Sequence, residues 1–420
     1  MKKYKLGEIA EVIGGVTYDK ADLSSYGIRI LRGGNIQNGE VCLKEDDVYL
    51  PYSYKDNRNT VQVGDTIIVA STGSVKVLGK AASTFSSLGD VQIGAFLRII
   101  RPKEQKYAAF ISAYIQSDLF RKYIQSQAKG TNINNIISEH LTSFALHFPC
   151  ESNLAHFSNL YYTLNRKIEL NRAINHNLEA MAKQVYDYWF VQFDFPDENG
   201  RPYKSSGGKM VWNATLKRDI PEGWHCGSLL EIATFTNGLA CQKFRPKAGE
   251  RSLPVIKIRE MREGFTADTE EVSFSIPDSV KIFNGDVLFS WSASLEVILW
   301  AYGNGGLNQH IFKVTSKNDF PRSFYYFQLL DYVGVFKKMA EARKTTMGHI
   351  TQDHLQQSTI AVPDNVDITH LFEEKFSPIF NQQIKLQEET QKLTKLRDEL
   401  LPLLMNGQVS VNYDLHFRDF

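Results

Sequence analysis

Two long stretches of the chain repeat their apolar residues at helical spacing. From Leu154 to Trp189 an apolar side chain recurs every three or four residues. This spacing places the side chains on one face of an α-helix, so the stretch predicts a helix of about 35 residues with an apolar stripe. A second stretch, roughly residues 368–405, carries an apolar residue at every seventh position from Phe372 to Leu400. It predicts a second long helix of the same kind.

The stripes also predict which side chains are packed between helices. The positions that we expect to be packed are Leu164, Ile168, Leu178, Met181, Trp189, Leu386, Leu393 and Leu400. Asn171 and Asn175 fall on the first stripe, where buried asparagines fix the register of a coiled coil at some cost in stability. The alternative is that both face solvent at a local bend. Pro378 has no backbone N–H and is expected to kink the second helix near its start.

Each long helix needs a partner for its stripe, and the simplest partner is the other helix. If a pseudo-two-fold axis relates the two halves of the chain, the helices run antiparallel. At a rise of about 1.5 Å per residue, a helix of about 35 residues spans about 50 Å, roughly one and a half turns of B-DNA. The alternative is that each helix packs on its own domain.

Short segments upstream of the two helices occur twice, so the chain is a tandem repeat. The segment 6–10 (LGEIA) matches 229–233 (LLEIA), and each is followed five residues later by a glycine, Gly15 or Gly238. Short apolar runs bounded by Gly, Asn and Asp turns fill the first two thirds of each repeat, which is typical of strands. Helical segments follow.

These patterns predict an α+β fold in which two repeated strand-rich α/β domains are joined by two long helices forming an antiparallel coiled coil. The expected division is a first domain at 1–150, a first long helix at 151–193, a connector at 194–221, a second domain at 222–365, a second long helix at 366–407 and a C-terminal tail at 408–420. The connector is rich in Pro, Gly, Ser and Lys, which indicates an exposed linker.

Composition agrees with a multidomain globular protein. The 420 residues carry a net charge of only +1, so any nucleic-acid site must be a local patch. No apolar run reaches the roughly 18–20 residues that span a bilayer, and the first residues lack the apolar core of a secretory signal. The four cysteines are scattered and form no C-x-x-C pair, so we expect reduced thiols in a cytoplasmic protein.

Catalytic and metal-binding motifs are not evident. The segment 73–81 (GSVKVLGKA) resembles a P-loop, but its spacing is one residue too long and Ala81 stands where a magnesium-binding Ser or Thr belongs. His349 and His354 flank Asp353 without a third clustered ligand, and Asp353 suits a helix cap equally well. We therefore expect no catalytic residue, metal or cofactor in this chain.

Positive charge concentrates at the equivalent place in both repeats. Residues 101–137 hold six Lys or Arg against two acidic residues, and residues 313–350 hold seven against three. We name the segments 128–136 (AKGTNINNI) and 342–350 (ARKTTMGHI), which close these patches, the reading loops. Lys and Arg neutralise phosphates, and Asn, Thr and His can contact base edges. The alternative is a solvated helix end followed by a polar turn.

The patches therefore predict double-stranded DNA as a ligand. The candidate DNA-binding residues are Lys122, Lys129, Thr131, Asn132, Asn134, Lys338, Arg343, Lys344, Thr345, Thr346 and His349. Because the two reading loops differ in sequence, we expect their two half-sites to differ as well.

With these motifs, the whole chain resembles the specificity subunit of type I restriction-modification systems. The most specific stretch is the first helix and connector, from "LNRKIELNRAINHNLEAMAKQVYDYWF" to "GRPYKSSGGKMVWN". The closing "KLRDELLPLLMNGQV", the domain starts "KLGEIAEVIGG" and "SLLEIATFTNG", and "GLNQHIFKV" are also typical of that family.

The resemblance implies a division of labour. Each of two target-recognition domains, similar to the DNA-reading domain of adenine-N6 methyltransferases, reads one half of a split target, and the helices set the gap. The subunit has no activity alone. It binds two methylation subunits, which use S-adenosylmethionine, and restriction subunits, which use ATP and Mg²⁺. The alternatives are a DNA-binding adaptor, a specificity subunit of a non-type I assembly, or an enzyme with an unrecognised site.

Overall fold

The computed structural model describes most of the chain, and its residues group into two compact units. The described residues are 2–37, 39–75, 77–127, 134–148, 151–266, 268–292, 294–342 and 350–405. Unit 1 comprises Met1–Ile168 with Leu393–Phe420, and unit 2 comprises Glu169–Lys392. Each unit contains one strand-rich head and a part of each long helix. We name residues 2–148 head 1 and residues 224–363 head 2.

Head 1 is built on two small sheets and a terminal strand pair. The first sheet has the order β2-β11-β7-β9 and consists of Ala10–Gly14, Leu97–Pro102, Thr66–Val69 and Ala81–Ser83. The second has the order β10-β3-β6 and consists of Val91–Ile93, Ile28–Leu31 and Val48–Leu50, with β10 and β3 parallel. Strand β1 (Lys2–Lys5) pairs with β13 (Ala145–Phe148). All four residues of β7 are buried, as expected for a short apolar strand inside a core.

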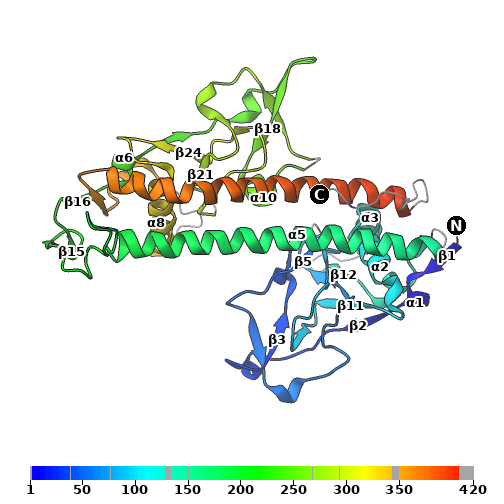
Figure 1. Ribbon diagram of the computed structural model, residues 1–420. Helices are drawn as coiled ribbons and strands as arrows, with labels where there is room; N and C mark the ends of the chain where they lie inside the picture. Colours follow the sequence, from blue (N-terminus) through cyan, green and yellow to red (C-terminus); the bar gives the residue numbers. More distant parts are fainter. Residues whose placement is uncertain are drawn as a thin grey trace, which may run out of the picture. The chain divides into compact units, whose positions relative to one another are not determined.

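Head 2 has an equivalent topology, with one further strand, β20, in its second sheet. Its first sheet has the order β17-β24-β21-β22 and consists of Ala233–Asn237, Ile311–Ser316, Val287–Ser290 and Glu296–Leu299. Its second has the order β19-β18-β23-β20 and consists of Glu271–Ser273, Ser252–Ile256, Gly305–Leu307 and Lys281–Ile282, with β18 and β23 parallel. Strand β16 (Trp224–Gly227) pairs with β25 (Ile360–Pro363). Figure 1 shows β2 beside β11 in head 1 and β21 beside β24 in head 2.

The glycines that recur in the sequence mark the same close backbone approach in both heads. A Cβ on Gly15 would lie 2.1 Å from the carbonyl oxygen of Gly94, and one on Gly238 would lie 2.2 Å from that of Asn308. The residue after each glycine donates its backbone N–H to the neighbouring strand, Val16 to the carbonyl of Ile93 and Leu239 to that of Leu307, over 2.8 Å in both cases. Only glycine leaves room for this contact, which explains why the residue occurs twice.

Each head also contains helices, and the longest of them follow the strands of its two sheets. Head 1 has α1 (Leu6–Ile9), α2 (Ala108–Gln116), α3 (Asp118–Gln127) and α4 (Ser138–Thr142). Head 2 has α6 (Leu229–Ile232), α7 (Ile258–Glu263), α8 (Arg322–Ala342) and α9 (Gln352–Gln356). The predicted α+β class with two repeated domains is confirmed.

The two long helices are continuous. Helix α5 spans Glu151–Tyr186 and leads into the π-helical turn η5 (Asp187–Val191). Helix α10 spans Asp367–Met405 and continues through Pro378 without a break. The connector after η5 carries a hairpin of β14 (Met210–Asn213) and β15 (Arg218–Pro221).

In each unit the part of α5 that belongs to it contacts the corresponding part of α10. In unit 2 the amide of Asn171 donates to Oε2 of Glu389 over 2.7 Å, and the rings of Tyr186 and Phe372 lie 5.9 Å apart. Partner numbers fall along α10 as they rise along α5, so the helices run antiparallel in this unit. In unit 1, Nη1 of Arg397 donates to Oδ1 of Asn165 over 3.0 Å.

The stripe residues differ in burial. Leu164, Ile168, Trp189 and Leu386 are buried, and Leu178, Leu393 and Leu400 are half-buried. The prediction for Met181 is wrong, because 46% of its surface is exposed. The buried row passes through Ala182 instead, which is 0% exposed, and the residue before it is turned by about 100° toward solvent.

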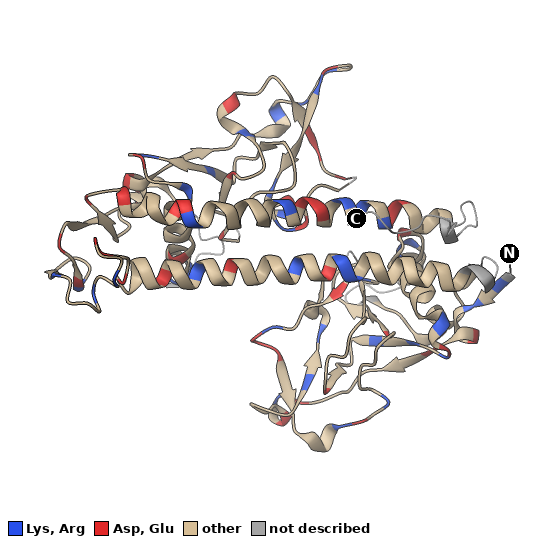
Figure 2. Cartoon of the chain, viewed as in Figure 1, with Lys and Arg blue, Asp and Glu red and all other residues tan. Residues whose placement is uncertain are grey.

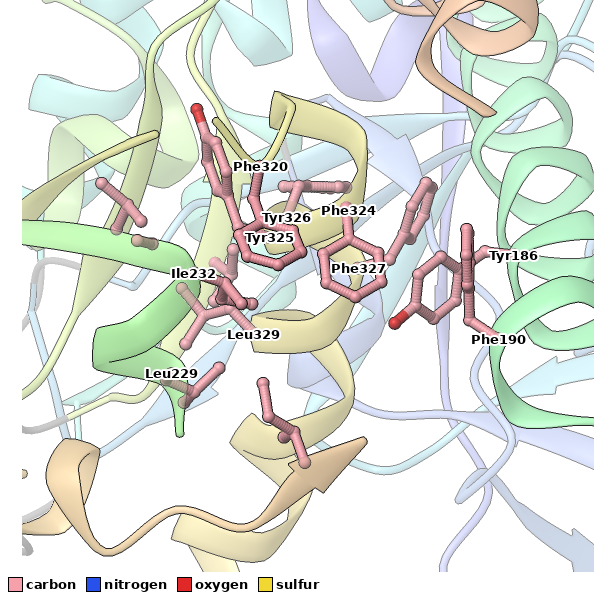
Figure 3. Close-up of a cluster of buried hydrophobic side chains, with 14 of the residues drawn as sticks. Tyr186, Phe190, Leu229, Ile232, Phe320, Phe324, Tyr325, Tyr326, Phe327 and Leu329 are labelled. Carbon is pink, nitrogen blue, oxygen red and sulfur yellow. The ribbon is translucent and has the colours of Figure 1, made fainter. Parts of the chain in front are cut away.

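Aromatic side chains join α5, η5, α8 and α10 within unit 2. Figure 3 shows Tyr186 and Phe190 facing Phe324 and Phe327 of α8, with ring centroids 5.0 Å apart for Tyr186–Phe327 and 5.1 Å for Phe190–Phe324. Phe372 of α10 completes the cluster and lies 5.1 Å from Phe190. Such offset and edge-on ring contacts add to the free energy of burial.

Replacing Phe372 by alanine tests how much this aromatic cluster contributes to the stability of the protein. The side chain is 0% exposed and touches rings from three segments, so we expect Phe372→Ala to lower the free energy of unfolding by about 3–5 kcal/mol. Its neighbour Leu371 is 37% exposed, and Leu371→Ala is the matched control with a much smaller expected effect. Urea unfolding of both variants is the measurement. Equal losses of unfolding free energy in the two variants would show that the cluster does not make this contribution to stability.

Candidate nucleic-acid interface

Both reading loops end at the same point of the repeated first sheet. In head 1 the N–H of Ile136 donates to the carbonyl of Ala70 over 2.8 Å, and in head 2 the N–H of Ile350 donates to that of Trp291 over 3.0 Å. Ala70 and Trp291 directly follow the equivalent strands β7 and β21. The two isoleucines are 1% and 3% exposed, so each loop is held at its end by a buried side chain and a backbone hydrogen bond.

Most residues predicted to bind DNA lie outside the described part of the chain. These are Lys129, Thr131, Asn132, Arg343, Lys344, Thr345, Thr346 and His349. Asn134 opens β12 (Asn134–Asn135), which pairs antiparallel with β8 (Ser71–Thr72). Lys122 on α3 and Lys338 on α8 are exposed to solvent. The predicted contacts of all these residues with DNA stay predictions.

Some of the basic residues counted in the two patches pair with acidic residues inside the heads. Arg101 binds Asp65 through two hydrogen bonds of 2.9 and 2.8 Å, and Asp65 is 1% exposed. In head 2, Nζ of Lys313 lies 2.9 Å from Oδ2 of Asp286 and also donates to the carbonyl of Lys281. The carboxylate of Asp65 is buried and needs such a partner, whereas that of Asp286 is partly exposed; Arg101 and Lys313 are both engaged in these contacts.

Lys103 and Lys317 make an equivalent contact in the two heads. Nζ of Lys103 donates to the carbonyls of Gly7 and Glu8 over 2.8 and 3.2 Å, and Nζ of Lys317 donates to that of Leu230 over 2.7 Å. These carbonyls belong to the short helices α1 and α6, where a cation is favoured by the helix dipole. Both lysines count toward the basic patches of the sequence, and in the fold they also make this repeated contact with a helix carbonyl.

A further cation of the first patch is also engaged. Nζ of Lys106 lies 3.1 Å from Oε2 of Glu104, and this hydrogen bond raises the pKa of the lysine. In Figure 2 basic and acidic residues occur together along both long helices and in both heads. Net charge counted along the sequence thus overstates the charge that each head can offer to phosphates.

Beside the anchor of each reading loop lies a turn that contains none of the residues predicted from the sequence to bind DNA. In head 1 it joins β10 to β11 and comprises residues 94–97, and in head 2 it joins β23 to β24 and comprises residues 308–311. The stretch 306–314 is typical of the family at the sequence level, but no residue in it received a role. The sequence gives no sign that the turn adjoins the reading loop, because the two are neighbours in space but about 40 residues apart along the chain.

The described residues provide neither a metal site nor a membrane-spanning helix. Within the described ranges, no group of three or more His, Cys, Asp and Glu side chains is arranged to hold a metal ion. None of the helices described in the structure combines the length and apolar character needed to cross a membrane.

Comparison with known proteins identifies the class. The family model described as "Type I restriction modification DNA specificity domain" matches residues 1–180 and 221–396, one region for each repeat. The chain belongs to this family.

Particular relatives match over more than two thirds of this chain. The specificity subunit of the type I restriction enzyme EcoKI of Escherichia coli K12 is 33% identical over 308 residues, which cover 69% of this chain and 61% of that protein. The specificity subunit of the type I restriction enzyme MjaIX of Methanocaldococcus jannaschii is 20% identical over 323 residues, covering 75% of this chain and 72% of that protein. The chain thus matches less than two thirds of the Escherichia coli protein's length.

A solved structure has the same fold. The S subunit of a type I restriction-modification system from M. genitalium superposes with a TM-score of 0.53 at 12% identity, covering 96% of this chain and 95% of that one. At this identity the likeness concerns the fold alone.

Exchanging Lys103 and Lys122 for methionine separates structural from DNA-facing charge. Lys103→Met removes the cation at the end of α1, so we expect the free energy of unfolding to fall by about 0.5–1 kcal/mol, with an unchanged salt dependence of DNA binding. Lys122→Met should leave stability unchanged and make the salt dependence shallower, by a slope of about 0.9 per lost phosphate contact. Urea unfolding and fluorescence anisotropy with a DNA duplex at several salt concentrations are the measurements. The same salt slope for both variants would contradict the assignment.

Proposed function

We propose that this chain is the DNA sequence-specificity subunit of a type I restriction-modification complex. The observation that carries the proposal is the repetition of one anchor: each head ends its reading loop on the residue after the same strand. A chain that serves one continuous DNA sequence has no need for two such heads. Membership in the specificity family and the names of the relatives support the proposal.

Each head reads one half of a split, asymmetric target. The frames that hold the loops are equivalent, whereas the loops carry different side chains, "AKGTNINNI" in head 1 and "ARKTTMGHI" in head 2. Base readout depends on the donors and acceptors that a side chain presents. Heads with unlike loops therefore select unlike half-sites.

The long helices act as the spacer that sets the gap between half-sites. Helix α5 belongs to both units and, at about 1.5 Å per residue, its 36 residues extend over about 54 Å. Hydrogen bonds join α5 to α10 within each unit, from Asn171 to Glu389 in unit 2 and from Arg397 to Asn165 in unit 1. A spacer of fixed register gives a fixed gap.

Chemistry is delegated to partners in this proposal. The chain positions two methylation subunits, which use S-adenosylmethionine to methylate adenine at N6, and restriction subunits, which use ATP and Mg²⁺. The chain itself supplies binding and geometry and is not catalytic. A pull-down that yields a methylation subunit in a ratio of about two to one would distinguish this assembly from a free DNA-binding adaptor.

Methylome sequencing is the direct test of the proposed function. We expect cells that express this chain with its methylation subunit to carry N6-methyladenine in a motif of two unlike specific halves separated by unspecified bases. Cells that express the methylation subunit alone are the control and should lack the motif. A palindromic or unsplit motif, or methylation without this chain, would refute the proposal.

Lengthening both helices tests the spacer. Four residues inserted after Ile168 and four after Lys392, the boundaries between the units, add about 6 Å and a rotation of about 40°. One to two base pairs of B-DNA advance and rotate by about the same amounts, so we expect the gap to grow by about one or two base pairs with both half-sites unchanged. Methylome sequencing of the variant reports the gap. An unchanged gap would mean that the helices are not the spacer.

A further inference from the structure

The turns at 94–97 and 308–311 are equivalent and firmly held. Each is closed by a hydrogen bond from its last N–H to its first carbonyl, from Leu97 to Gly94 over 2.9 Å and from Ile311 to Asn308 over 3.1 Å. The first residue of each turn is bound in addition to the parallel strand beside it. Both turns therefore present their middle residues from a rigid frame.

Each turn lies next to the anchor of a reading loop. In head 1 the carbonyl of Phe96 accepts the N–H groups of Ala70 and Ser71, over 2.9 and 3.1 Å, and the carbonyl of Ala70 accepts the N–H of Ile136. In head 2 the carbonyl of His310 accepts the N–H of Trp291 over 3.3 Å, and Trp291 in turn binds the N–H at the end of its loop. In both heads a single residue, Ala70 or Trp291, thus links the turn to the end of the reading loop through its backbone hydrogen bonds.

The side chains of the two turns differ in chemistry. In head 1 the turn carries Ala95 and Phe96, and the phenyl ring is 64% exposed. In head 2 the same positions carry Gln309 and His310. Oε1 of Gln309 accepts a hydrogen bond from Asn308 over 3.0 Å, and Nδ1 of His310 has no hydrogen-bond partner among the described atoms. Nδ1 of His310 is buried, so the turn of head 2 presents the amide of Gln309 where the turn of head 1 presents the ring of Phe96.

Exposure alone does not single out Phe96, since isolated apolar side chains are common on protein surfaces. Tyr26 of the same head is 73% exposed. The decisive feature is position: the ring projects from the residue whose carbonyl holds the loop anchor, and the equivalent residue in head 2 is also aromatic. His310 there packs its ring 5.6 Å from Trp291, whose Nε1 donates to Asn237 over 3.1 Å.

We propose that these two turns are a second pair of DNA-contacting elements, apolar in head 1 and hydrogen-bonding in head 2. Phe96 makes an apolar contact with the half-site of head 1, for which a thymine methyl group is the natural partner. Gln309 hydrogen-bonds a base edge in the half-site of head 2, where an amide side chain suits adenine. His310 orients the turn through Trp291 beside it. This inference rests on the proposed function and adds residues to it outside the reading loops.

Methylome sequencing of variants tests the turns even though the target sequence is undetermined, because genomic DNA presents every sequence. We expect Phe96→Ala to weaken the preference for one base pair in one half-site by about tenfold, and Gln309→Ala to do the same in the other half-site only. Phe96→Leu should keep most of the preference, since it keeps an apolar side chain. Gln309→Glu exchanges amide for carboxylate and should move the preference at the same position from adenine toward cytosine.

Tyr26→Ala is the matched control for an exposed ring of the same head, and its motif should equal that of the wild type. Urea unfolding of each variant separates loss of preference from loss of fold, and the leucine and glutamate variants retain bulk if an alanine variant is unstable. Wild-type preferences at every position in Phe96→Ala and in both Gln309 variants would overturn the inference while leaving the split motif in place. Absence of a split motif in the wild type would instead overturn the proposed function.

Discussion

The burial of two apolar stripes is the interaction on which the rest of the structure depends. A helix as long as α5 or α10 is marginally stable alone in water, and it persists because its apolar face is covered. In unit 2 that cover includes Phe372 of α10 and the aromatic residues of α8. Each large buried side chain contributes roughly 1.5–3 kcal/mol, which sets the pairing but leaves its register open. Asn171 and Asn165 add polar contacts between the helices, with Glu389 in unit 2 and with Arg397 in unit 1.

A second constraint separates what the heads share from what distinguishes them. Their strands, the glycine contacts at Gly15 and Gly238, and the anchors at Ile136 and Ile350 are equivalent and lie in the core. The side chains of the turns at 94–97 and 308–311 differ between the heads, and the two reading loops differ in sequence. A close-packed core resists change, whereas a surface loop tolerates it. One frame can therefore support two different recognition surfaces.

Charge has two roles in this chain that its sequence does not distinguish. Arg101 and Lys313 pair with aspartates, and Lys103 and Lys317 bind helix carbonyls, so these cations contribute to the structure of the heads. Lys122 and Lys338 are exposed and remain candidates for phosphate contact. A long cationic side chain can reach a carbonyl or carboxylate that is distant in the sequence, and only the folded chain shows which partner it has found.

The sequence by itself determined the tandem repeat, the strand-rich heads and the extent of both long helices, because period and turn residues act locally and do not depend on distant contacts. It placed the reading loops at equivalent positions for the same reason. Tertiary structure decided that Met181 faces solvent beside buried Ala182, that four basic residues are structural, and that the turns at Phe96 and His310 adjoin the loop anchors. Each of these depends on distances between residues far apart in the chain. Packing sets those distances, and periodicity carries no record of them.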